Sequence, residues 1–197
     1  MSAIGSALRD ARTRLNLTQA QAAQLLATQQ ANISAYEHGR LEPGRVVTAR
    51  IDALAKLERN SGYADYLAST MPSAAAQIRA DLAAGRSDTD MLRVVIQASD
   101  DFARLTTSPD HAFFLTEPSP TGSRQWDALL AGLAVHLCRQ AHLTTAPFWT
   151  TDPARQIDHI WWVDSSAPAA RARLLQEAIP AMRARGVMMS RRNLESV

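Results

Sequence analysis

The segment at residues 17–43 limits the fold of this chain more than any other feature. Its sequence is LTQAQAAQLLATQQANISAYEHGRLEP. Thr18 stands at the position of an N-cap, directly ahead of the helix-forming run QAQAAQLL. A second run, ANISAYEHG, ends at Gly39, and glycine is a common helix terminator. The segment therefore predicts two short helices joined by a tight turn.

The side chains of this segment fit two helices that cross at close range. Such a crossing needs a small side chain at the contact, which Ala23 supplies. Apolar packing around the crossing comes from Leu26, Ile33 and Tyr36. Polar side chains gather near the start of the second helix, as in a helix that enters the DNA major groove. These polar residues are Gln29, Gln30, Asn32 and Ser34.

The segment resembles the XRE or Cro-like helix-turn-helix family over about residues 4–58. The resemblance rests on LTQ at 17–19, Ala23, Ile33-Ser34, YEHG at 36–39 and Pro43. It implies that Gln19 contacts a phosphate and that Arg40 and Arg45 neutralise backbone phosphates. It also implies an internal ion pair between Arg12 and Glu37. The residues that it places at base edges are Gln29, Gln30, Asn32 and Ala35. Ser34 is a further candidate DNA-binding residue, because it is one of the polar side chains near the start of the second helix.

Gln30 is the residue that we expect to read an adenine, because a carboxamide can bond both N7 and the N6 amino group of that base. One such unit has little selectivity, so we expect a homodimer on double-stranded DNA with a palindromic operator. Ala27 departs from the family, which commonly has glycine in the turn. Since alanine disfavours positive φ, we expect a turn in which Ala27 avoids the left-handed region.

The 197 residues carry a net charge of only +2, but the charge is segregated along the chain. Eight basic and five acidic residues give residues 1–60 a charge of +3. Seven basic and twelve acidic residues give residues 61–170 a charge of −5, and six basic and two acidic residues give residues 171–197 a charge of +4. The basic first part favours an anionic partner, and the acidic middle favours a different task.

Membrane and secretory functions are not expected for this chain. No apolar run approaches the roughly 18–20 residues of a membrane span. The N-terminus lacks the basic-then-apolar layout of a secretory signal. We therefore expect a cytoplasmic protein with no membrane partner.

The pattern beyond the first segment predicts an all-α fold. Residues 1–70 are expected to form a five-helix helix-turn-helix domain whose last helix lies at 63–69. Residues 71–197 are expected to form a mostly helical C-terminal domain, with helical periodicity near 90–105 and 124–141. Two short apolar bursts, IWWV at 160–163 and VMM at 187–189, are typical of strands and leave room for one two-stranded element.

Trp149, Trp161 and Trp162 are the candidate partner-binding residues of the C-terminal domain. Adjacent residues of a strand point to opposite faces, so only one of Trp161 and Trp162 can enter a single core. The other either packs within the chain or contacts a dimer mate or another partner, where exposed aromatic side chains dominate binding energy.

Catalytic, metal and cofactor sites are not expected. His136 and Cys138 would lie about 200° apart on a helix, which does not suit a shared ion. The acidic residues of this domain lie in patterns typical of surfaces and helix ends. We therefore expect a protein that is not an enzyme.

The C-terminal part resembles a set of bacterial XRE-type regulators encoded beside nucleotidyltransferase-like toxins. The resemblance covers about residues 90–197 and rests on WDALLAGLAVHLCRQAHL, APFWT, IWW, RARG and VMMS. It implies an antitoxin that represses its own operon through residues 1–60 and binds its cognate toxin through the rest. The alternative is a free-standing repressor whose C-terminal domain senses a small ligand in an aromatic pocket.

Overall fold

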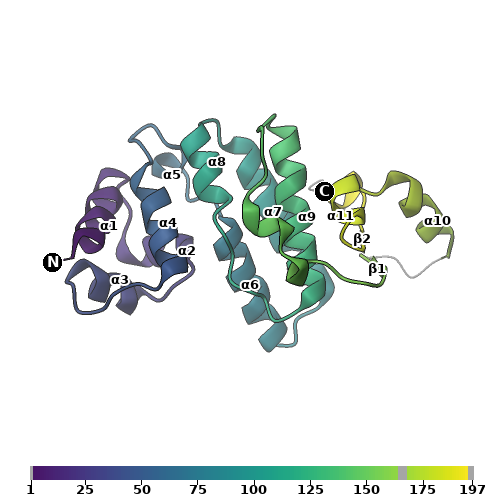
Figure 1. Cartoon of the computed structure of the whole chain (residues 1–197), viewed down its shortest axis with the longest axis horizontal. Helices are drawn as coiled ribbons and strands as arrows, with labels where there is room; N and C mark the ends of the chain where they lie inside the picture. Colours follow the sequence, from purple (N-terminus) through teal and green to yellow (C-terminus); the bar gives the residue numbers. More distant parts are fainter. Residues whose placement is uncertain (1, 164–167, 195–197) are drawn as a thin grey trace. The chain divides into compact units, whose positions relative to one another are not determined.

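The computed structural model describes residues 2–163 and 168–194, and the chain is mostly helical (Figure 1). The expected all-α fold with one short two-stranded element is confirmed. The chain forms two compact units. Unit 1 comprises Met1–Ser73 and Asp101–Pro118, and unit 2 comprises Ala74–Asp100 and Ser119–Val197.

The two units do not divide the chain at a single point near residue 70. The boundaries between the units fall inside α6 (Met71–Ala83), inside α7 (Asp88–Arg104) and after Pro118. Unit 1 therefore also includes residues 101–118. That stretch contains a helix that packs against the N-terminal helices, as described below. Sequence periodicity does not show this return, because helical spacing is the same in both units.

Unit 1 contains the five helices of the predicted N-terminal domain and a sixth, α8 (Ser108–Phe114), from the range 71–197 that was expected to belong to the C-terminal domain. In chain order they are α1 (Ala3–Arg14), α2 (Gln19–Leu25), α3 (Gln30–Glu37), α4 (Arg45–Ala55), α5 (Gly62–Asp65) and α8 (Ser108–Phe114). Helix α1 packs against α3 and α4, α2 packs against α3, and α4 packs against α8. Their shared core is apolar and fully buried, and includes Leu8, Leu15, Ile33, Ile51 and Leu54.

Local signals determine where these helices begin and end. Ser2 caps α1 by accepting from the Gly5 N–H, and Thr18 caps α2 in a capping box with Gln21. Gly39 follows α3 with a positive φ of 68°, the conformation that glycine adopts most readily. These ends hold α2 and α3 to seven and eight residues.

Helix α5 is shorter than the predicted helix at 63–69. It ends at Asp65, and Tyr66 adopts extended backbone angles. The reason is a tertiary contact with the returning stretch: the Tyr66 hydroxyl donates to Asp101 Oδ1 at 2.9 Å, and the Ser69 N–H donates to Asp101 Oδ2 at 2.7 Å. Asp110 of α8 likewise accepts from the Ser61 hydroxyl and the Gly62 N–H.

Unit 2 is built around α9 (Arg124–Gln140), which is buried along most of its length. Trp126 lies in this core and is 2% exposed. Helix α11 (Pro180–Arg183) packs closely on α9 because Gly132 has no side chain, and a Cβ there would lie 2.9 Å from Met182 Cα. This unit also contains most of α6 and α7, together with α10 (Pro168–Glu177) and the short 3-10 helices η1 (Phe148–Thr151), η2 (Pro153–Arg155) and η3 (Arg191–Leu194).

The two apolar bursts form the predicted two-stranded element. Strand β1 (Trp161–Trp162) pairs with β2 (Val187–Met188) in parallel, with Trp161 opposite Val187. Gly186 precedes β2 with a φ of 83°. A side chain at this glycine would overlap the backbone at His159, so the close approach of the two segments requires glycine.

Candidate nucleic-acid interface

The turn between α2 and α3 uses a left-handed residue, and that residue is Ala27. Its φ is 50°, so the expectation that Ala27 avoids positive φ is wrong. The Thr28 N–H donates to Ala23 O at 2.9 Å and the Ala27 N–H donates to Gln24 O at 3.1 Å. This pair of bonds is the Schellman arrangement, which requires a left-handed residue directly after the C-cap. The turn therefore has the geometry that glycine favours, with alanine in its place.

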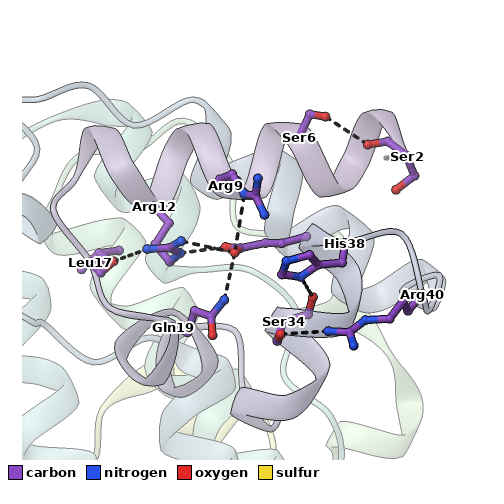
Figure 2. A network of polar contacts seen from close by, with 10 residues as sticks. Ser2, Ser6, Arg9, Arg12, Leu17, Gln19, Ser34, His38 and Arg40 are labelled. Carbon is purple, nitrogen blue, oxygen red and sulfur yellow. Dashed lines mark hydrogen bonds and ion pairs between the residues drawn. The ribbon is translucent and has the colours of Figure 1, made fainter.

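A buried carboxylate joins α1, α2 and α3. Glu37, at the end of α3, is 1% exposed and accepts from Arg12 Nε at 2.7 Å and from Arg12 Nη2 at 3.2 Å. Gln19 Nε2 donates to the same carboxylate at 3.0 Å, and Arg9 Nε lies 3.9 Å away. Figure 2 shows Arg9, Arg12 and Gln19 converging on one point from α1 and α2. The predicted Arg12–Glu37 pair is present and fixes the orientation of α3.

The pKa of Glu37 lies below its ordinary value of 4.5. Burial by itself would raise this pKa, but the hydrogen bonds from Arg12 and Gln19 and the charges of Arg12 and Arg9 outweigh it. Glu37 is therefore an anion at neutral pH.

The first residues of α3 present amide side chains to the surface. Gln29 is the N-cap and Gln30 the first helical residue, and both are exposed. Asn32 is half-buried, and its Nδ2 donates to Thr28 Oγ1 at 3.1 Å, so part of its amide is engaged with the turn. Of the three amides, those of Gln29 and Gln30 have the greater access to a ligand.

Ser34 and Ala35 lie half-buried on the following turn of α3. Ser34 is four residues after Gln30 and so shares its face of the helix. The Ser34 hydroxyl accepts from Arg40 Nη2 at 3.3 Å, and the Ser34 carbonyl lies 2.7 Å from His38 Nδ1 (Figure 2). Arg40 is thereby held beside α3 while remaining exposed.

Arg45 and Gln19 have different surroundings. Arg45 is exposed at the first residue of α4. Gln19 is half-buried, and its Nε2 donates to Glu37, so its amide orients the internal carboxylate in addition to any contact with a phosphate. The structure thus gathers the α3 residues and Arg40 together, whereas Gln19 belongs partly to the buried network.

Residues far from the turn in the sequence also support it, and no sequence motif predicted them. Arg50 of α4 is 1% exposed, and its Nη1 donates to Leu26 O at 2.9 Å. Its Nε and Nη2 donate to Glu117 O at 3.1 and 2.8 Å. The Thr70 hydroxyl donates to Leu25 O at 2.9 Å. Terminal carbonyl groups of α2 are therefore bonded by residues far away in the sequence, which no local pattern indicates.

The three candidate partner-binding tryptophans lie in unit 2 with little free surface. Trp149 is 7% exposed, and the Arg155 guanidinium lies 4.8 Å from its ring centre. Trp161 is half-buried and packs edge-on against the Trp126 ring, with centres 5.1 Å apart. Trp162, also half-buried, has the Arg171 guanidinium 5.5 Å from its ring centre. Trp149 is thus a packing residue in this structure.

Exposed apolar side chains lie elsewhere in unit 2. Phe148, next to Trp149, is 91% exposed, and Ile160 and Leu175 are 50% and 46% exposed. Phe148 and Trp149 are adjacent aromatic residues of the same short 3-10 helix. The sequence therefore gives no sign that one side chain is exposed and the other buried.

His136 and Cys138 lie buried in α9. Burial lowers the pKa of His136, as do the charges of Arg191 and Arg139, and burial raises the pKa of the Cys138 thiol. Within residues 2–163 and 168–194 no three His, Cys, Asp or Glu side chains are grouped so that they could hold a metal ion.

Comparisons with protein-family models, curated proteins and solved structures found no match for this chain. In the described part of the chain, no helix combines the length and apolar character needed to cross a membrane.

Proposed function

We propose that the chain is a sequence-specific DNA-binding transcriptional regulator of the XRE or Cro-like helix-turn-helix family. The observation that carries the proposal is the exposed start of α3, where Gln29 and Gln30 offer amide groups and Ser34, one turn later, accepts from Arg40. The buried Glu37 network holds this helix against α1 and α2, so its exposed side chains can read bases without first becoming ordered. Arg40 and Arg45 supply charge for the phosphate backbone.

The regulator acts in the cytoplasm as a homodimer on a palindromic operator. A single recognition helix contacts few base pairs, and a two-fold dimer doubles that number. The half-sites are then about one helical turn apart, and each α3 reads one of them.

Binding to the promoter of the chain's own gene tests this function. The full chain should shift that promoter fragment at concentrations that leave random DNA of the same length unshifted. Gln30→Ala should weaken binding to the operator with little effect on random DNA. The matched control is Gln24→Ala, because Gln24 is an exposed glutamine of α2 outside the proposed interface. Equal losses on operator and random DNA for Gln30→Ala would contradict base reading by this residue.

We further propose that the regulator is an antitoxin that represses its own operon and neutralises a partner toxin through unit 2. The support is the exposed apolar set Phe148, Ile160 and Leu175, all of which lie in unit 2, because exposed apolar side chains are typical of protein-binding surfaces. Expression of the chain with its neighbouring genes should yield a stable complex with one product, and Phe148→Ser should weaken that complex while leaving operator binding intact.

The second candidate function is a free-standing repressor whose unit 2 senses a small ligand. The observation that favours it is a cavity in unit 2, although that cavity is polar and neither Trp149 nor Trp161 lines it.

A further inference from the structure

A cavity of about 220 Å³ opens on the surface of unit 2. The residues that line it come from η1, η2 and the end of α11. They are Thr150, Thr151, Asp152, Arg155, Gln156, Ala184 and Arg185. Two guanidinium groups thus border one small cavity, although Arg155 and Arg185 lie thirty positions apart in the sequence.

Packing fixes both arginine side chains in place. Arg155 is 5% exposed, and its guanidinium lies over the Trp149 ring. Arg185 Nη1 donates to Ala181 O at 2.9 Å, and its Nη2 donates to Thr150 O at 2.7 Å. A guanidinium has five N–H donors, so Arg185 retains donor capacity beyond these two bonds. The arginines are therefore ordered before any ligand arrives, which lowers the entropy cost of binding.

The surroundings of Arg185 are positively charged. Within residues 2–163 and 168–194, no carboxylate forms an ion pair with Arg185. Burial lowers the pKa of Arg185, and the charge of Arg139 lowers it further. Arg124 is not a lining residue, but its Nη2 donates to the carbonyl of the lining residue Gln156 at 3.1 Å. The one acidic residue of the lining, Asp152, is exposed, and its Oδ1 accepts from the Ala154 N–H at 2.9 Å.

We propose that this cavity binds a small phosphate-bearing anion through the guanidinium groups of Arg155 and Arg185. Two positive charges at one site match a dianion, and a phosphate monoester is close to a dianion at neutral pH. Guanidinium groups also donate strong, charge-assisted hydrogen bonds to phosphate oxygens. The inference does not depend on DNA binding by unit 1, because every residue of the cavity lies in unit 2.

Titration of the full chain with inorganic phosphate at constant ionic strength tests the proposal. Calorimetry should give saturable binding of one phosphate per chain, and acetate should bind more weakly because it carries a single charge. A nucleoside monophosphate distinguishes the source of the group: tighter binding than inorganic phosphate assigns the site to a larger phosphate ester, and equal binding assigns it to free phosphate. Absence of saturable phosphate binding, or acetate binding of equal strength, would overturn the proposal.

Two substitutions at exposed lining positions leave Arg155 and Arg185 unchanged. Thr151→Glu introduces a carboxylate and should weaken phosphate binding at least about ten-fold, because it neutralises one of the two cations. Asp152→Asn removes a carboxylate and should strengthen binding, while its Oδ1 can still cap η2. The controls with the same charge changes are Thr13→Glu and Asp10→Asn, which are exposed on α1. If the controls change phosphate affinity as much as the lining variants do, phosphate is responding to net charge and the proposed site is wrong.

Discussion

Arg12 of α1 and Glu37 of α3 form a two-point ion pair, with Nε and Nη2 donating to Oε1 and Oε2 at 2.7 and 3.2 Å. The two residues are separated by 25 positions. Arg12 also donates from Nη1 to Leu17 O at 3.0 Å, and Leu17 precedes Thr18, the N-cap of α2. One side chain therefore connects the first helix to both helices of the proposed DNA-binding unit.

Removing the charge of Glu37 should destabilise unit 1 strongly. In Glu37→Gln, the half-buried Arg12 guanidinium loses its anionic partner, and loss of one member of a buried pair typically costs about 3–5 kcal/mol. Urea denaturation should show this decrease in the free energy of unfolding. Arg9→Gln is the control, because Arg9 is more exposed and lies 3.9 Å from the carboxylate, and it should change stability by less than about 1 kcal/mol.

The contribution of Glu37 to the free energy of unfolding should also depend on pH. Because its pKa in the folded chain is lowered, ionised Glu37 stabilises the folded state fully above the ordinary value of 4.5. That stabilisation is lost as the pH falls through the lowered folded-state pKa. Denaturation curves between neutral pH and about pH 3 should therefore show the stability gap between the wild type and Glu37→Gln narrowing in acid. A stability difference that stays constant or widens in acid would contradict the lowered pKa of Glu37. The control is Glu58→Gln, at an exposed position, whose free energy of unfolding should change with pH as that of the wild type does.

Ala27→Gly should stabilise the chain. Alanine at a φ of 50° bears a conformational penalty of about 1–2 kcal/mol, which exceeds the entropy penalty of about 0.5–1 kcal/mol that glycine brings. Thermal denaturation should give a modestly higher Tm. Ala20→Gly provides the opposite case, since Ala20 is exposed within α2 and the substitution should lower the Tm. A decrease for both variants would show that Ala27 is not strained.

Arg50→Met should destabilise unit 1 by at least about 2 kcal/mol, although methionine fills much of the same volume. The substitution leaves the Leu26 carbonyl, which accepts in a buried hydrogen bond, without its donor, and such an unsatisfied group costs about 1–3 kcal/mol. It also removes the two hydrogen bonds to the carbonyl of the exposed Glu117. Arg79→Met is a suitable control, because Arg79 is exposed and donates to Pro120 O at 3.3 Å. Equal stability of the two variants in urea would show that the carbonyl contacts of Arg50 contribute little.

Arg40→Ala should weaken DNA binding for operator and random sequences alike. A phosphate contact carries no base information, and its loss should reduce the slope of log affinity against log salt by about 1. Affinities measured over a range of salt concentrations provide the slope. Arg59→Ala removes an exposed cation beyond α4 and should leave the slope unchanged. If the two variants have the same slope, Arg40 contributes only general charge.

Local sequence signals predicted much of the proposed interface. Thr18 and Gly39 fix the ends of two short helices through interactions within a few residues, so these ends could be found without tertiary information. The backbone angle of Ala27 was predicted wrongly, because the bonds of Thr28 and Ala27 to the end of α2 outweigh the preference of alanine for negative φ. Trp149 and Phe148 show the same limit, since adjacent aromatic residues differ in exposure through packing alone.

The sequence by itself determined the all-α class, the two short helices and the amide-rich start of the second one, because these depend on residues close together in the chain. Only the tertiary structure decided that residues 101–118 return to unit 1, that Arg50 supports the turn, and that Arg155 and Arg185 meet at one cavity. These relationships join residues tens of positions apart. Such long-range relationships depend on which apolar faces pack together and on which buried carbonyl groups need a hydrogen-bond donor. A local sequence pattern contains neither kind of information.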